Sequence, residues 1–230
     1  TLGEHNILAF LLNNGGGLFN PAGQPDVSYA RNVEAITFLT DMVKDGSLDP
    51  AGAGWQSSDL EKAFGQGRVA MIVDTPGVQG RFSADVARQI GLLNPLKSPH
   101  GTYGTIKWIA SLMIYNTTKY PDAAMTFVSW LARNQLSFWT QGHSTMLPVT
   151  HSSDSASYFK ADPFAPRIFG EWLPIGAYTG ARSKTLFPQL NAVEGQGFMQ
   201  KMAQQISLGQ DPGSIIAGAS AALADVMKNS

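Results

Sequence analysis

The side chains that most often perform catalysis or bind metals are sparse and scattered in this sequence. His143 and His151 are too far apart to pair on one face of a helix, and no carboxylate stands beside them at ligand spacing. Cysteine is absent, which excludes disulfides, thiolate zinc sites and cysteine nucleophiles. The GxSxG, HExxH and Walker patterns are missing too. The sequence therefore predicts no catalytic residue, no metal site and no cofactor.

Asp74 is the acidic residue with the most informative position, because it follows a continuous apolar run. Two interpretations stay open: a functional carboxylate at the end of a buried strand, or the N-cap of the next helix. Asp59 and Glu61 lie two residues apart on a predicted helix, point in different directions, and indicate a solvated face.

Charge and hydropathy exclude several classes of partner. The net charge is −1, and charged residues make up only 14% of the chain against the ~25% usual for soluble domains. This balance argues against binding to nucleic acid or to a membrane surface. No stretch is apolar for long enough to cross a bilayer.

The elements around Asp74 predict an α/β fold. A helix begins near Ser58, where Glu61 completes a capping-box spacing, and it ends at Gly65. The run Arg68–Val73 is typical of a strand covered on both faces, and residues 74–77 begin another helix. We expect Ala70 and Ile72 to be buried. In an open α/β sheet, ligands bind at the carboxyl edge of the strands.

The rest of the chain continues this alternation. Ser28–Lys44, for example, places apolar residues along one stripe, and Asp211 is placed to cap the last helix. Trp130 and Trp139 have apolar neighbours and are expected in the core. Strands are predicted at 90–93 and 105–114, and helices at 4–14, 28–44, 77–87, 122–133, 135–141, 190–208 and 213–227.

Several segments resemble those of a known family. AFGQGRVAMIVDTPG, preceded by FLTDMVKDGSLDP, is similar to the pattern of the extracellular solute-binding proteins of ABC importers, family 1, whose sugar-binding branch is maltose-binding-protein-like. The order and spacing of the matches extend from about His5 to Met227. The start Thr-Leu-Gly-Glu has two interpretations, a removed leader or a piece of a longer protein. The resemblance favours the second and implies that the chain corresponds to the later part of a family member.

The resemblance implies a periplasmic-binding-protein-like α/β fold, mostly the C-terminal lobe with a helical excursion that belongs to the other lobe. Residues 1–109 and 158–230 would form the C-terminal lobe, and residues 110–157 would belong to an incomplete N-terminal lobe. The chain would then cross between the lobes near Trp108–Ser111 and His151–Ser157.

The implied function is the capture of a sugar or oligosaccharide in an interlobe cleft by hinge closure, without enzymatic chemistry. The implied partners are a small-molecule solute, most simply a carbohydrate, and an ABC permease in the membrane. The implied location is periplasmic or extracellular, tethered to the surface of a bacterial cell. Because the helix at 122–133 has an apolar face, we also expect the chain either to self-associate through residues 110–157 or to hold this segment in a rearranged position against the remaining lobe.

The expected ligand-binding residues combine aromatic rings, which stack on sugar faces, with planar polar groups, which bind hydroxyls. The resemblance places Trp108 at the lobe crossover, Trp172, Tyr178 and Arg182 around a cleft-facing loop, and His5 at another cleft position. The Asn-Asn-Gly-Gly-Gly run has two interpretations, a helix C-cap or a backbone that lets a ligand approach closely. The expected set is His5, Asn13, Asn14, Gly77, Gly104, Trp108, Trp172, Tyr178 and Arg182.

Two departures from the family pattern leave alternatives open. Oligosaccharide binders of the family often have an aromatic residue where this chain has Gly77, and another where it has Glu194 or Gln196. One alternative is therefore a binding protein for another small polar solute, such as a polyol phosphate or a polyamine. The others are an α/β enzyme fragment whose catalytic residues lie outside this chain, and a structural interaction module.

Overall fold

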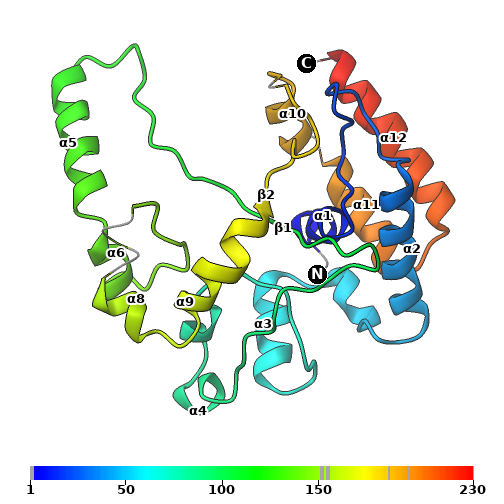
Figure 1. Ribbon diagram of the computed structural model, residues 1–230, viewed down its shortest axis with the longest axis horizontal. Coiled ribbons are helices and arrows are strands. Elements are labelled where there is room, and N and C mark those ends of the chain that lie inside the picture. Colours follow the sequence, from blue (N-terminus) through cyan, green and yellow to red (C-terminus); the bar gives the residue numbers. More distant parts are fainter. Residues whose placement is uncertain (1–2, 151–152, 154–155, 186, 196, 230) are drawn as a thin grey trace. The chain divides into compact units, whose positions relative to one another are not determined.

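The computed structural model describes residues 3–150, 153, 156–185, 187–195 and 197–229. The chain forms two compact units (Figure 1). Unit 1 comprises residues 1–73, 93–107 and 172–230, and unit 2 comprises residues 74–92 and 108–171. Each unit has an apolar core of its own.

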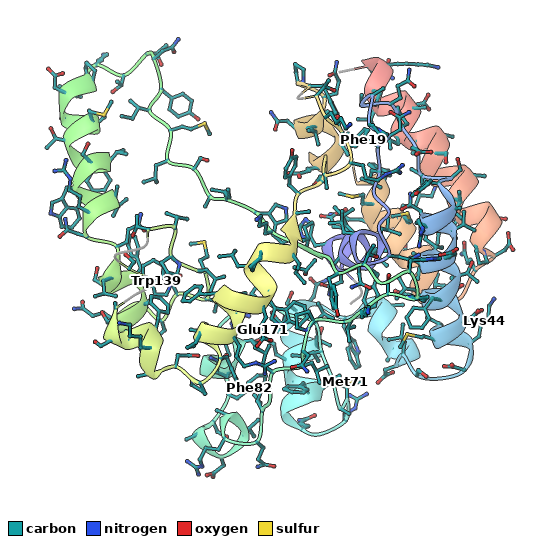
Figure 2. The ribbon with its side chains drawn as sticks, in the orientation of Figure 1. Phe19, Lys44, Met71, Phe82, Trp139 and Glu171 are labelled. Carbon is teal, nitrogen blue, oxygen red and sulfur yellow. The ribbon has the colours of Figure 1, made fainter. Side chains whose placement is uncertain are left out.

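Unit 1 is built around α1 (Glu4–Asn13), whose residues are too apolar for a surface helix. Ile7, Leu8 and Leu11 are buried, and α1 packs against α2 (Ala30–Lys44), α11 (Phe198–Ser207) and β1 (Thr105–Ile106). The helix α12 (Pro212–Asn229) covers α11 and α2. Phe19 also lies in this core, edge-on to Phe187 (Figure 2).

The sheet of unit 1 has two parallel strands among the described residues. Thr105 pairs with Gly176 and Ile106 pairs with Ala177, which form β1 and β2 (Gly176–Ala177). The remaining elements of unit 1 are η1 (Pro50–Gly54), α3 (Ser57–Gly65), η4 (Leu173–Ile175) and α10 (Leu190–Gly195).

Unit 2 has a smaller core in which Trp139, Phe159 and Ala165 are buried and Phe169 packs against them. Trp139 lies edge-on to Phe159 and donates its indole N–H to the carbonyl oxygen of Met146. The elements of unit 2 are η2 (Val78–Arg81), α4 (Ala84–Ala87), α5 (Pro121–Arg133), α6 (Leu136–Thr140), α8 (Ser157–Ala161) and α9 (Ala165–Arg167). A π-helix, η3 (Ile168–Trp172), follows α9 and ends at the start of the last segment of unit 1.

The prediction of a central strand at Arg68–Val73 is wrong for this structure. The segment is irregular, Ala70 is exposed, Ile72 is half-buried and Met71 is 69% exposed (Figure 2). An apolar run becomes a buried strand only where other strands pair with its backbone, and no described residue does so here. The same reason applies to 90–93, which is irregular, and to 105–114, where only Thr105 and Ile106 form a strand.

The helices follow the sequence more closely, with local differences. The cap of α3 is Gln56, whose backbone N–H donates to Asp59, so the capping box lies two residues earlier than expected. Ser83 is extended and divides the helix predicted at 77–87 into η2 and α4. Gly197, with φ of +70°, separates α10 from α11 in the helix predicted at 190–208; residue 196 lies outside the described residues.

The two tryptophans expected in the core have different outcomes. Trp139 is buried, as expected. Trp130 is 56% exposed, because none of the described residues covers the face of α5 on which it lies. Among the described residues, no helix is both long and apolar enough to cross a membrane.

Candidate functional site

The carboxyl ends of β1 and β2 are the part of unit 1 where a ligand would be expected to bind. Because the two strands are parallel and in register, both end at the same edge of the sheet. Lys107 follows β1 directly, donates its backbone N–H to the carbonyl oxygen of Ala177 at 2.7 Å, and places its Nζ 3.5 Å from the carbonyl oxygen of Leu173. Tyr178 follows β2 directly and is 48% exposed.

Trp172 precedes η4 and β2, on the amino-terminal side of the strand. Its indole N–H donates to the carbonyl oxygen of Leu93 at 3.3 Å, and its ring is half-buried. The hydrogen bond fixes the ring relative to the segment 93–107, which leads into β1. Two aromatic side chains that the sequence selected thus flank the short strand β2.

The carboxyl end of α1 is tied to the same segment. Asn13 donates its side-chain amide to the carbonyl oxygen of Leu96 at 2.6 Å, and Thr102 donates its hydroxyl to the carbonyl oxygen of Asn13 at 2.7 Å. Gly104 approaches the helix so closely that a Cβ there would lie 2.5 Å from the carbonyl oxygen of Leu12. The glycine is therefore needed for packing, and the predicted residues Asn13 and Gly104 meet at this point.

Asn14 is buried, and its side chain is occupied inside unit 1. Its amide donates to the carbonyl oxygen of Arg31 at 2.8 Å and to the carboxylate of Glu34 at 2.9 Å. Glu34 also contacts His100 Nε2 at 2.5 Å. These contacts give Asn14 a structural role, and its role in ligand binding stays a prediction.

His5 lies at the opposite end of α1 from Asn13. Eight residues of helix rise about 12 Å at 1.5 Å per residue. The imidazole is exposed and lies 3.6 Å from the carboxylate of Glu4. The structure therefore does not bring His5 to the end of α1 that meets Gly104.

Arg182 lies in the loop after β2 and is mostly buried. Its guanidinium donates to Asp26 at 3.0 Å and lies over the ring of Tyr29, 3.8 Å from the centroid. Contact between Arg182 and a ligand stays a prediction. The guanidinium already pairs with Asp26 and lies over Tyr29.

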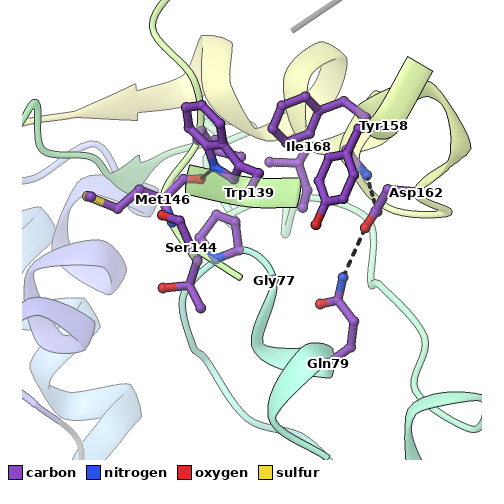
Figure 3. Close-up of a pocket in the computed structure, with 13 residues that line it drawn as sticks. Gly77, Gln79, Trp139, Ser144, Met146, Tyr158, Asp162 and Ile168 are labelled. Carbon is purple, nitrogen blue, oxygen red and sulfur yellow. Dashed lines mark hydrogen bonds between the residues drawn. The ribbon is translucent and has the colours of Figure 1, made fainter. Parts of the chain in front are cut away.

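The two remaining predicted residues, Gly77 and Trp108, belong to unit 2. Trp108 is 48% exposed. Gly77 lines a cavity of about 40 Å³ with Gln79, Trp139 and Asp162 (Figure 3). This volume holds about one water molecule, whereas sites for drug-sized ligands have roughly 300–1,000 Å³.

Asp162 organises the polar side of this cavity (Figure 3). Its carboxylate accepts hydrogen bonds from the backbone N–H groups of Phe164 and Ala165, both at 2.8 Å, and from Gln79 Nε2 at 3.3 Å. These bonds begin α9 and hold η2 beside it. The cavity is therefore a packing feature of unit 2.

Sequence reasoning missed Lys107 and Thr102. Lys107 stands directly before the selected Trp108, and Thr102 stands two residues before the selected Gly104, so both had a neighbouring signal. A lysine or a threonine does not by itself indicate such a contact in a sequence. The contacts of Lys107 and Thr102 join segments that lie far apart in the chain. Within the described part of the chain, no group of three or more His, Asp or Glu side chains could hold a metal ion.

The sequence profile of the bacterial extracellular solute-binding proteins matches residues 2–136, which is more than half of the 230-residue chain. The chain belongs to this family. Its resemblance to the family, inferred from the segments around Asp74, is confirmed by this match. A protein of Brucella abortus (strain 2308) that is named as a binding protein is 22% identical over 143 residues.

Three solved structures have a similar fold. A sugar transporter from Arthrobacter chlorophenolicus A6, with bound laminaribiose, is 28% identical with a TM-score of 0.90 over 97% of this chain. Maltose-bound MalE3 of T. maritima is 16% identical with a TM-score of 0.75 over 95% of the chain, and MalE of Xanthomonas citri is 17% identical with a TM-score of 0.73 over 98%. The expected periplasmic-binding-protein-like α/β fold is confirmed.

The chain matches only part of the length of each of these relatives. The match covers 35% of the Brucella protein, 57% of the Arthrobacter protein and 56% of each MalE protein. The chain therefore spans between about a third and somewhat more than half of their lengths.

Proposed function

We propose that this chain is part of the substrate-binding component of an ABC importer that captures a sugar or oligosaccharide. The observation that supports this most strongly is the similarity, at 28% identity and a TM-score of 0.90, to a sugar transporter that holds laminaribiose. The exposed ring of Tyr178 at the carboxyl end of β2 agrees with it, because sugar faces stack on aromatic rings.

The proposed mechanism is capture by hinge closure, without chemistry. A ligand that contacts two lobes stabilises the closed arrangement by its differential affinity for the closed and open states, and the membrane permease distinguishes the two. We assign residues 1–109 and 158–230 to one lobe and residues 110–157 to the other. Unit 2 contains the described residues of 110–157, together with residues 74–92, 108–109 and 158–171, which this assignment gives to the first lobe.

The proposed ligand contacts are aromatic and polar residues, each described within its own unit. Tyr178 and Trp172 flank β2, and Trp108 follows β1 by two residues. Asn13 and Gly104, which meet at the carboxyl end of α1, are also in the proposed set. Gly77, His5 and Asn14 complete the proposed set, and Arg182 is treated separately below.

The proposed location is periplasmic or extracellular, with the protein tethered to a bacterial cell surface. The family's description as extracellular supports the location. The tether and the permease are inferred from the family alone.

The test is a thermal-shift and calorimetric screen of the natural full-length protein that contains this chain. The solutes are laminaribiose, maltose, a polyol phosphate and a polyamine. A ligand at 100 times its Kd stabilises the folded state by about 2.7 kcal/mol, so a binder raises the melting temperature. We expect laminaribiose or maltose to do so. Stabilisation only by the phosphate or the amine would change the ligand class, and hydrolysis of either disaccharide would replace the proposal with an enzyme.

A further inference from the structure

We propose that Arg182 is a positioning residue, whose ion pair with Asp26 holds the loop that presents Tyr178. This inference rests on the proposed function, because the assignment of Tyr178 as a ligand contact is part of that proposal. Arg182 then acts indirectly, by fixing the position of Tyr178, and does not contact the sugar itself.

The first support is the environment of the Arg182 side chain. Only 19% of the side chain is exposed, and 26% of that of Asp26. The guanidinium donates to Asp26 Oδ2 at 3.0 Å and lies over the ring of Tyr29. The ion pair and the ring contact hold the guanidinium against Asp26 and Tyr29, and the low exposure leaves little of the side chain accessible to a ligand.

The second support is the surface on which Arg182 rests. Its stem packs over Gly17, where an added Cβ would lie 3.2 Å from Arg182 Cδ. Gly17 is itself fixed by Asn32, a fully buried side chain that accepts from the Gly17 N–H at 2.8 Å and donates to the Gly17 carbonyl oxygen at 2.9 Å. Asn32 also donates to the carbonyl oxygen of Asp26 at 3.0 Å, so one buried amide holds both Gly17, beneath the Arg182 stem, and the backbone of Asp26.

The third support is the short path from Arg182 to Tyr178. The loop consists of two consecutive turns: Ala181 N–H donates to the carbonyl oxygen of Tyr178, and Ser183 N–H donates to that of Gly180, both at 2.9 Å. A Cβ on Gly180 would lie 3.2 Å from Tyr178 Cε2, so the ring is folded against the loop. A shift of Arg182 is therefore transmitted to the Tyr178 ring through the three residues between them.

The loop has a second attachment that keeps it folded when the ion pair is removed. Lys184 N–H donates to the carbonyl oxygen of Pro21 at 3.1 Å, and Phe187 packs edge-on against Phe19. We therefore expect loss of the ion pair to loosen the loop without unfolding unit 1.

The experiment is a double-mutant cycle of Arg182→Met and Asp26→Asn in the full-length protein, with laminaribiose as the probe. We expect each single variant to weaken binding about tenfold, which corresponds to about 1.4 kcal/mol. We expect the double variant to be weakened about tenfold as well, because both changes remove one interaction. Arg182→Lys keeps the charge and should recover most of the affinity. Lys184→Met, which removes an exposed cation from the same loop, is the matched control and should bind normally.

Direct ligand contact predicts a different pattern. Arg182→Met would then weaken binding while Asp26→Asn leaves it unchanged, or the two effects would multiply to about a hundredfold. Either result overturns the inference.

Hydrogen exchange without ligand separates this inference from the proposed function. We expect the amides of residues 179–183 to exchange faster in both single variants, with those of α11 unchanged as a sign of intact folding. If the wild-type protein binds no sugar, the proposed function fails, and faster exchange in both variants still supports the anchoring of the loop. Unchanged exchange in residues 179–183 overturns the inference whatever the protein binds.

Discussion

The tryptophans of unit 2 differ in what their surroundings allow them to do. Trp139 is buried and donates its indole N–H to Met146, as a core residue does. Trp108 presents about half of its surface to solvent, two residues after β1. An exposed ring beside a strand end can stack on a ligand, whereas a buried ring serves stability.

Replacement of each tryptophan by alanine should therefore have opposite effects. Trp108→Ala should weaken sugar binding markedly and leave the melting temperature without ligand nearly unchanged. Trp139→Ala should lower the free energy of unfolding by about 3–5 kcal/mol, because it leaves a cavity and an unpaired carbonyl oxygen. Calorimetry and urea titration of the two variants measure both quantities. A large loss of ligand-free stability in Trp108→Ala would contradict its assignment to the site.

At the scale of elements, the last helix shows how a cap connects stability to pH. Asp211 accepts the backbone N–H of Ser214 at 2.8 Å at the start of α12. The pKa of Asp211 lies below its usual 3.8, chiefly because this backbone N–H stabilises the carboxylate, with a further contribution from the charge of Lys44.

Because the folded pKa is depressed, the contribution of Asp211 to stability is fully present above the unfolded pKa of 3.8. This contribution is lost as the pH falls through the lower, folded pKa. Asp211→Ala should therefore lower the urea midpoint at pH 7 and have a smaller effect at pH 3. Asp211→Asn retains the capping oxygen without the charge, so its midpoint at pH 7 should lie between those of the wild type and the alanine variant. An equal effect of Asp211→Ala at both pH values would show that the carboxylate charge is irrelevant to α12.

The segment 68–73 provides a second test at this scale. An aspartate at Met71 should change the free energy of unfolding by no more than about 0.5 kcal/mol, because this side chain is 69% exposed. The matched change Ile36→Asp places a carboxylate in the core of unit 1, where the side chain is fully buried, and should prevent folding. Circular dichroism and urea titration of the two variants decide. Loss of folding in Met71→Asp would show that 68–73 is an internal strand after all.

At the scale of the whole molecule, unit 2 leaves an unusual amount of apolar side chain in contact with solvent. No residue of α5 is buried, and Phe127 and Trp130 stack on each other at its surface, 6.5 Å between ring centroids. The preceding residues Leu112, Met113 and Tyr115 are exposed too. Patches of this kind drive association.

The purified chain should therefore associate as its concentration rises. Phe127→Ser together with Trp130→Ser should reduce the association measured by light scattering, because the pair forms the centre of the exposed face. Phe38→Ser, which removes an exposed aromatic ring from α2 in unit 1, is the control and should have little effect. A chain that stays monomeric at high concentration, with the amides of α5 protected from hydrogen exchange, would contradict the prediction.

The sequence by itself determined most of the helices and the family. A helix is held by bonds between residues four apart and ended by local caps, so Glu4–Asn13, Pro121–Arg133 and the Asp211 cap could be read from neighbouring residues. The strands could not, because a strand exists only where a distant segment pairs with it. Thr105 and Ile106 therefore form a strand with residues 176–177, and Arg68–Val73 does not form one. For the same reason only the tertiary structure decided what Arg182 does: its partner Asp26 lies 156 residues away in the chain.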